Sequence, residues 1–356
     1  MNLTEQQKTA MTAYEAFIRR ASEINMPFML KGSYVTRQYF PENIIRVPAD
    51  LDWVFIDPID EPDQASLIFS RWVVRITELT MDDNVVFRSF KENSFWRMMD
   101  YAMADDFPTV NTDIRCWVDG IEFEFGLDIS FNLEIPGGTK PLAYKPMSGS
   151  GFTVPHTAPL HLQVAWKIHQ TLVRPRLKDL FDLMYLVQHP GFNREALLQS
   201  FDALLRECIA DELGFTRIEN FLNYQLDGLF RWASLKESWE YWRHGNTDIE
   251  KSWYFGRDEM ARYITNVNRL PVKLTIFMNQ FRECMESAGF NMELSLEFPD
   301  EIAELYNMDE SRKESDQDSN QAKQDDTKTH LSEPSSSVPT KNRVLSWIHK
   351  LLKGSD

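Results

Sequence analysis

The sequence predicts an α+β protein with strands in the first part of the chain and helices in the second. Short apolar or alternating segments, typical of strands, occupy residues 27–31, 51–56, 84–90, 112–118 and 121–131. From Ala158 onwards apolar residues recur with helical spacing, predicting helices over 158–173, 176–188 and 193–210. The chain has 356 residues, 43% of them hydrophobic, which is enough for two domains.

The N-terminal segment predicts a helix, a strand and a tight turn. Thr4 can cap a helix that runs to about Ile24, with Gln7 completing a capping box. The strand that follows ends at Gly32-Ser33, and a helical turn continues to Tyr39. Glycine lets a backbone approach a phosphate closely, and the serine hydroxyl and nearby N–H groups can bind its oxygens. A plain turn is the alternative for this pair.

Two further elements frame the sheet. Pro62 fits the first position of a helix. Its predicted inner face carries Leu67, Ile68, Trp72, Val73 and Ile76. Asp119-Gly120 predicts a two-residue hairpin, and the return strand 121–131 alternates cleanly, which places Asp128 on its polar face.

Two acids lie one residue apart in Asp50-Leu51-Asp52-Trp53. Side chains alternate along a strand, so both carboxylates point to one face and repel each other unless a cation lies between them. Asp128 is placed to join them, although Glu124 on the same strand is a rival. We interpret the set as a divalent-metal site, the chemistry of phosphoryl or nucleotidyl transfer. A solvated strand end is the alternative.

A basic patch follows in the predicted helices, comprising Lys167, Arg174, Arg176 and Lys178. It suits contact with a triphosphate, or it is a solvated cationic face. The apolar stripe of helix 176–188 is expected to be buried and consists of Leu177, Leu180, Phe181 and Met184. Asp179 and Asp182 lie off this stripe. They form either an exposed salt-bridged surface or a network that orients Lys167 and a nucleotide.

Composition limits the class of protein. The formal charge is −16, and an acidic body does not favour general nucleic-acid binding. The three cysteines, Cys116, Cys208 and Cys284, are widely spaced, which suits a reducing cytoplasm. No apolar run approaches the roughly 20 residues that span a bilayer, and the N-terminus does not resemble a signal peptide. We therefore expect a cytosolic protein.

Five segments, in this order, resemble the AbiEii/AbiGii toxin family of the DNA polymerase β-like nucleotidyltransferase superfamily. They are Leu30-Lys31-Gly32-Ser33, Ala49-Asp50-Leu51-Asp52-Trp53, Leu127-Asp128-Ile129-Ser130-Phe131, Ala165-Trp166-Lys167-Ile168-His169 and Arg176-Leu177-Lys178-Asp179-Leu180-Phe181-Asp182-Leu183. The similarity covers about residues 25–190. Serine at position 33 and tryptophan at position 53 depart from the commoner family residues.

The resemblance implies a polymerase β-like mixed sheet with flanking helices, followed by a helical C-terminal region. It implies that Asp50 and Asp52 bind Mg²⁺ with Asp128 completing the set, and that Ser33 holds the phosphates of an NTP. Lys167 and Asp182 would match later family motifs that are needed for toxicity, so the resemblance implies that both join the three aspartates as catalytic residues. Members are typically toxins of toxin–antitoxin or phage-defence systems. Some of them transfer nucleotides to tRNA, so an RNA or protein acceptor and an antitoxin partner are implied.

We expect four regions in the chain. These are a nucleotidyltransferase core over 1–155, a helical domain over 156–305, a disordered linker over 306–340 and a short basic amphipathic helix over 341–356. That last helix suits docking on a partner, on a membrane surface or back on the enzyme. The main alternative for the whole chain is a non-catalytic nucleotide- or partner-binding protein that keeps a nucleotidyltransferase-like fold.

Overall fold

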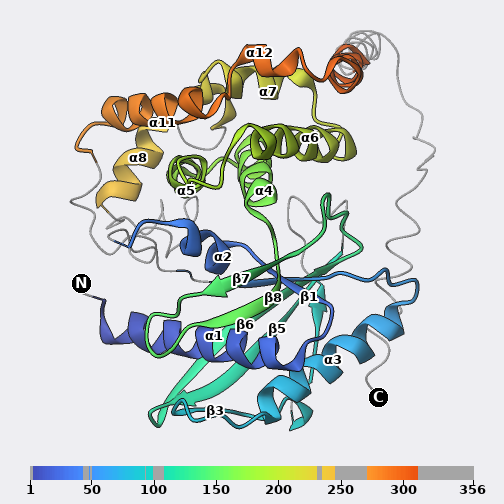
Figure 1. Cartoon of the computed structure of the whole chain (residues 1–356), viewed down its shortest axis with the longest axis vertical. Helices are drawn as coiled ribbons and strands as arrows, with labels where there is room; N and C mark the ends of the chain where they lie inside the picture. Colours follow the sequence, from blue (N-terminus) through green and yellow to red (C-terminus); the bar gives the residue numbers. More distant parts are fainter. Residues whose placement is uncertain are drawn as a thin grey trace, which may run out of the picture.

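The computed structural model of the chain consists of a sheet half and a helical half that lie one above the other (Figure 1). It describes residues 3–42, 48, 50–92, 94–98, 108–230, 235–244 and 271–311. The sheet half precedes the helical half in sequence, and α4 leads from one to the other (Figure 1). The predicted arrangement, a mixed sheet with flanking helices followed by a helical region, is confirmed.

Helix α1 (Glu5–Ile24) begins with the predicted capping box. Gln7 N donates to Thr4 Oγ1 at 3.1 Å, and Thr4 N donates to Gln7 Oε1 at 3.0 Å. The helix ends at Asn25, which adopts a left-handed conformation and turns the chain into the sheet.

The eight-stranded sheet has the order β3-β5-β6-β2-β1-β8-β7, with β4 also paired to β5. The strands are β1 (Phe28–Lys31), β2 (Leu51–Phe55), β3 (Val85–Phe87), β4 (Arg97–Met98), β5 (Thr109–Val118), β6 (Ile121–Phe131), β7 (Lys140–Tyr144) and β8 (Phe152–Thr157). Strands β2 and β6 are parallel neighbours, whereas β1–β2 and β5–β6 are antiparallel. Strands β2 and β6 are therefore direct neighbours in the sheet although they are far apart in the sequence.

The predicted hairpin at Asp119-Gly120 is confirmed. Val118 pairs with Ile121, and the two turn residues have φ angles of 48° and 80°. Both values lie in the left-handed region that tight two-residue hairpins require. Two strand predictions need correction, since β3 is shorter than 84–90 and β5 begins at Thr109 rather than Thr112.

One face of the sheet is apolar and is covered by α1 and by α3 (Pro62–Glu78), as Figure 1 shows. Phe28 of β1 stacks on Trp72 of α3 with 3.8 Å between ring centroids. Pro62 occupies the start of α3 as predicted. The placement of Leu67 on the inner face was wrong, because its side chain is 61% exposed and Phe69 is buried in the core instead.

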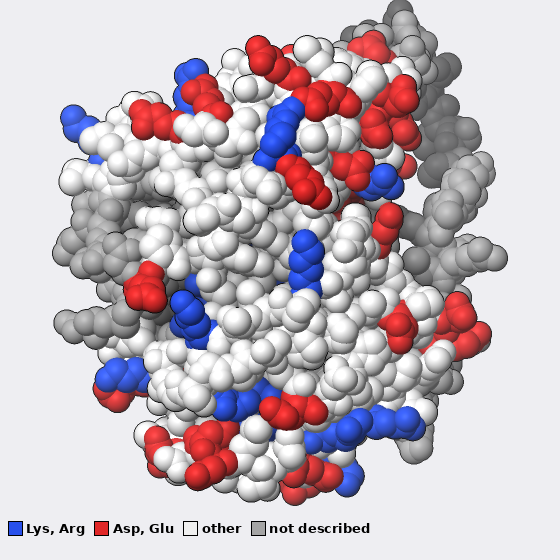
Figure 2. All heavy atoms as spheres, in the orientation of Figure 1, with Lys and Arg blue, Asp and Glu red and all other residues white. Residues whose placement is uncertain are grey.

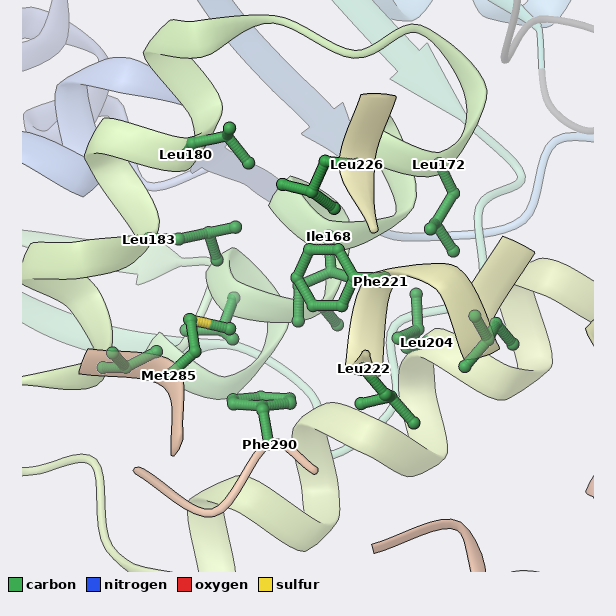
Figure 3. Packing of buried hydrophobic residues seen from close by; sticks show 14 of the residues in the cluster. Ile168, Leu172, Leu180, Leu183, Leu204, Phe221, Leu222, Leu226, Met285 and Phe290 are labelled. Atoms are coloured by element: carbon green, nitrogen blue, oxygen red, sulfur yellow. The ribbon is translucent and has the colours of Figure 1, made fainter. Parts of the chain in front are cut away.

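The helical half has its own apolar core (Figure 3). Its helices are α4 (Leu160–Val173), α5 (Leu177–Val187), α6 (Arg194–Ala210), α7 (Phe215–Leu222), α8 (Leu235–His244), α11 (Leu274–Ala288) and α12 (Met292–Ser295), with a further helix over 299–311. Ile168, Leu180 and Phe221 meet in this core from three different helices. The three helices predicted after Ala158 are thus confirmed.

Two expected boundaries differ from the structure. Strand β8 runs past position 155 to Thr157, and the last described helix includes 306–311, which were assigned to the linker. Residues 312–340 and the predicted terminal helix over 341–356 lie outside the described residues. Among the residues that are described, no helix is long and apolar enough to cross a membrane.

Candidate active site

A row of five polar side chains crosses the face of the sheet that lies opposite α1 and α3. Strand register places Lys31 beside Asp52, Asp52 beside Asp128, Asp128 beside Asn111 and Asn111 beside Arg97. Residues paired across neighbouring strands share a face of the sheet, and the strands lie about 4.7–4.9 Å apart. Asp52 and Asp128 therefore lie next to each other at the centre of the row.

Asp50 and Ser33 border this row. Asp50 immediately precedes β2 and is exposed, and Ser33 Oγ donates a hydrogen bond to Asp50 Oδ1 at 2.9 Å. Ser33 itself is buried at the start of the short helix α2 (Ser33–Thr36). The structure thus brings together the glycine-serine turn and the acidic pair that the sequence separates by 17 positions.

Gly32 fits this place for a steric reason. Its φ is +70°, and a Cβ added there would lie 2.3 Å from Asp52 Oδ2. Only glycine tolerates both the conformation and the close approach. The backbone of Gly32 therefore lies directly against the carboxylate of Asp52. A ligand bound at this point would contact both residues.

The carboxylates of the site repel one another. Burial raises the pKa of Asp52 to about 7, and the charges of Asp50 and Asp128 add to this effect. Lys31 and Lys178 act in the opposite direction and lower that pKa. Asp52 is a candidate functional residue, because its pKa is strongly raised and it lies where the sheet meets the helical half.

The donor set suits a divalent cation such as Mg²⁺. Asp50, Asp52 and Asp128 offer the hard oxygen ligands that this ion prefers, and their mutual repulsion is what a bound cation would relieve. Among the described residues, no group of three potential ligands already has metal-binding geometry. Binding would therefore require the carboxylates to converge.

The helical half contributes a buried ion network. Lys167 Nζ lies 2.7 Å from Asp179 Oδ1 and 2.9 Å from Asp182 Oδ2. Arg176 Nε lies 2.7 Å from Asp179 Oδ2. Both acids are fully buried, so the alternative of an exposed salt-bridged surface was wrong. The interpretation as a network around Lys167 agrees with this geometry.

Lys178 connects the two sets of charges. It lies in the first turn of α5, is buried, and lowers the pKa of both Asp52 and Asp179. Burial alone would raise the pKa of Asp179, yet Arg176, Lys167 and Lys178 hold it well below its usual range. Lys178 therefore lies within electrostatic range of carboxylates in both halves of the molecule.

Direct contacts fix the helical half on the sheet. Thr36 Oγ1 donates to Gln163 Oε1 of α4 at 3.0 Å. Lys31 Nζ lies 5.8 Å from the centre of the Trp166 ring, and Trp166 packs beside Met29, next to the row of polar side chains. These contacts hold α4 near the carboxylates.

Two sequence alternatives can be compared with this geometry. Glu124, the rival of Asp128, is exposed and pairs with Arg115, four residues beyond Asn111 along β5 and away from Asp52. Arg174 of the basic patch is exposed in the α4–α5 connection. Sequence reasoning missed Lys31, Asn111 and Arg97, although the alternating polar positions of β5 contained a signal for Asn111.

Charge on the molecular surface is mixed on one face of the protein (Figure 2). On the face drawn in Figure 2, lysine and arginine side chains are scattered singly among acidic ones, and acidic side chains predominate at the top over the helical half. The described residues on this face form no continuous basic stripe of the kind that tracks a nucleic-acid backbone.

Comparisons with known proteins find weak structural similarity at low sequence identity. No family model and no curated protein matches the chain. Among solved structures, the chain is similar to JHP933 from Helicobacter pylori, with a TM-score of 0.46 and 13% identity over 83% of this chain and 96% of that chain. It is also similar to MenT4, a nucleotidyltransferase toxin from Mycobacterium tuberculosis, with a TM-score of 0.41 and 12% identity over 85% of this chain and 95% of that chain.

Proposed function

We propose that this protein is a magnesium-dependent nucleotidyltransferase that moves a nucleoside monophosphate from an NTP to a hydroxyl group of RNA or protein. The observation that carries the proposal is the register of Asp52 and Asp128 on adjacent strands, with Asp50 beside them and with Lys178 of the helical half near enough to lower the pKa of Asp52. This arrangement opposes a carboxylate cluster to a cation, as binding of a metal–triphosphate complex requires.

The proposed reaction breaks one bond and forms one. The acceptor oxygen forms a bond to the α-phosphorus, the bond from that phosphorus to the bridging oxygen breaks, and pyrophosphate leaves with the bonding electrons. The proton of the acceptor hydroxyl passes to a carboxylate or to water. Mg²⁺, held by Asp50, Asp52 and Asp128, would neutralise phosphate charge and acidify the acceptor hydroxyl.

The residues of the chain would bind and orient the NTP. Ser33 Oγ, which donates to Asp50 in the present structure, can donate to a phosphate oxygen instead. Lys178 offers a positive charge to the triphosphate from the opposite side. Lys167 is held by Asp179 and Asp182, so in this proposal it fixes α4 against α5, the helix that carries Lys178.

The biological role that we propose follows the family resemblance. A toxin of a toxin–antitoxin or phage-defence system would act on tRNA or on a protein of its own host and would be restrained by an antitoxin protein. The charge on the face drawn in Figure 2 is mixed and selects neither acceptor, so tRNA and protein are two outcomes of one assay.

The proposal is tested by transfer of label from each α-labelled NTP, with Mg²⁺, to total RNA and total protein from the host. Asp50→Ala should abolish transfer. Asp57→Ala is a matched control, because Asp57 is an exposed acid beyond the other end of β2. Absence of label from every fraction, with folded protein, would favour a non-catalytic binding protein.

A further inference from the structure

The side-chain amide of Asn111 lies between Asp128 and Arg97. Asn111 Nδ2 donates to Asp128 Oδ1 at 2.5 Å, and Arg97 Nη2 donates to Asn111 Oδ1 at 2.5 Å. The Asn111 side chain is almost fully buried between the two. A chain of hydrogen bonds therefore runs from an arginine on β4 to a candidate metal ligand on β6.

The direction of this chain is fixed by chemistry. A carboxylate can only accept, and a guanidinium can only donate, so the amide of Asn111 fits in one orientation. Arg97 is itself held in place, because its Nη2 also lies 2.5 Å from Asp113 Oδ1 and its guanidinium lies 5.1 Å from the ring centre of Phe95. The orientation of Arg97 is thereby transmitted to Asp128.

A glycine on the neighbouring strand leaves room for the amide. A Cβ added to Gly126 would lie 3.2 Å from Asn111 Nδ2, which is tighter than ordinary van der Waals contact. The backbone of Gly126 is outside the left-handed region that would itself require glycine. Space for Asn111 is thus a physical reason for glycine at this position of β6.

We propose that Asn111, oriented by Arg97, is a positioning residue that fixes the carboxylate of Asp128 for metal binding; this inference rests on the function proposed above. A neutral amide directs the carboxylate without cancelling its charge. An arginine in direct contact would compete with the metal for Asp128. Placing the guanidinium one strand further away, a step of about 4.8 Å, supplies orientation and avoids that competition.

The alternative role is purely structural, with Asn111 only joining β4 to β5. Metal affinity separates the two roles, because partners that orient metal ligands typically contribute about 10- to 100-fold in affinity. A structural link would change the stability of the fold and leave the affinity for metal unchanged.

The test is Mn²⁺ binding to the full-length protein, measured by electron paramagnetic resonance with a non-hydrolysable NTP analogue present. Asn111→Leu keeps roughly the side-chain volume and removes the donor, and we expect at least about tenfold weaker Mn²⁺ binding. Excess Mn²⁺ should then restore NTP turnover. The matched control is Arg115→Gln, which lies on the same strand as Asn111 but pairs with Glu124 away from the site, and it should leave Mn²⁺ affinity unchanged.

Gly126→Ala provides a second variant that removes no functional group. It should displace Asn111 and weaken Mn²⁺ binding less than Asn111→Leu does. Wild-type affinity in both variants would overturn the positioning role while leaving the proposed function intact. If the wild-type protein bound no Mn²⁺ even with the analogue, the proposed function itself would fail.

Discussion

The two halves of the molecule handle buried charge in opposite ways. In the sheet half, burial and neighbouring acids raise the pKa of Asp52 to about 7. In the helical half, Asp179 is more deeply buried, yet three cations hold its pKa well below its usual range. The ionised form of an aspartate is therefore disfavoured in the sheet half and favoured in the helical half.

This difference separates function from support. The helical network around Lys167 satisfies its own charges and needs no ligand to be stable. The acidic cluster of the sheet keeps a repulsion that the fold does not remove, and such a cost is expected at sites that bind a cation. Replacing an acid of the sheet site should therefore lower activity without lowering stability. Replacing a residue of the network around Lys167 should chiefly lower stability.

The largest expected effect on activity comes from Asp52→Asn. The variant removes a negative charge from the proposed metal site and should reduce nucleotidyl transfer by at least about 10²-fold. Its stability without metal should stay equal or rise, because the repulsion with Asp50 and Asp128 is relieved. Transfer assays and urea unfolding in a chelator measure both quantities. Full activity would contradict the account.

Lys167→Met should have the largest effect on stability. It leaves Asp179 and Asp182 buried without their shared cation, which typically costs about 3–5 kcal/mol when a buried pair is broken. Urea unfolding measures the loss. A variant as stable as the wild type would show that the helical network does not support the fold.

The pH dependence of stability should also distinguish the halves. Between an unfolded pKa of about 3.9 and a folded pKa of about 7, folded Asp52 holds a proton that the unfolded chain has released. Its contribution to stability therefore falls as pH rises through this window. The lowered pKa of Asp179 has the opposite sign, so its contribution is present above about pH 4 and is lost on acidification.

Unfolding of wild type and Asp52→Asn at several pH values, in a chelator, measures this contribution. The difference between the two curves isolates Asp52, since both proteins share other titrating groups such as His169, whose pKa burial lowers to about 4. A difference that does not change between about pH 4 and pH 7 would show that Asp52 titrates normally.

The smallest expected effect is that of Glu124→Gln, which discriminates between the two acids of β6. Glu124 is exposed and pairs with Arg115, so transfer activity should be unchanged. Asp128→Asn, a substitution of the same kind four residues away, should abolish transfer. The reverse result would indicate that Glu124, and not Asp128, is the metal ligand of β6.

Local signals predicted much of the fold. The capping box at Thr4, the hairpin at Asp119-Gly120 and the start of α3 at Pro62 each depend on a few neighbouring residues, and all three are present. Strands β7 and β8 were not predicted. Their pairing depends on contacts that a strand pattern interrupted by proline, such as Phe152–Thr157, does not reveal.

The geometry of the candidate site depends on long-range pairing. Sequence alone placed Asp52 and Asp128 on polar faces, but only the parallel pairing of β2 with β6 makes them neighbours. Asn111 was missed because β5 was expected to start one residue after it. Burial of Asp179 and Asp182 was missed because the amphipathic pattern of α5 assigns charged residues to solvent, whereas tertiary ion pairs bury them here.

The central claim is that both halves form one nucleotide site, and calorimetric titration with a non-hydrolysable NTP analogue and Mg²⁺ tests it most directly. Asp52→Asn in the sheet and Lys178→Gln in the helical half should each weaken binding by at least about tenfold, as expected for a lost charged contact. Arg174→Gln, an exposed cation nearby, should bind like the wild type. Wild-type affinity in folded Lys178→Gln would contradict a site shared by the two halves.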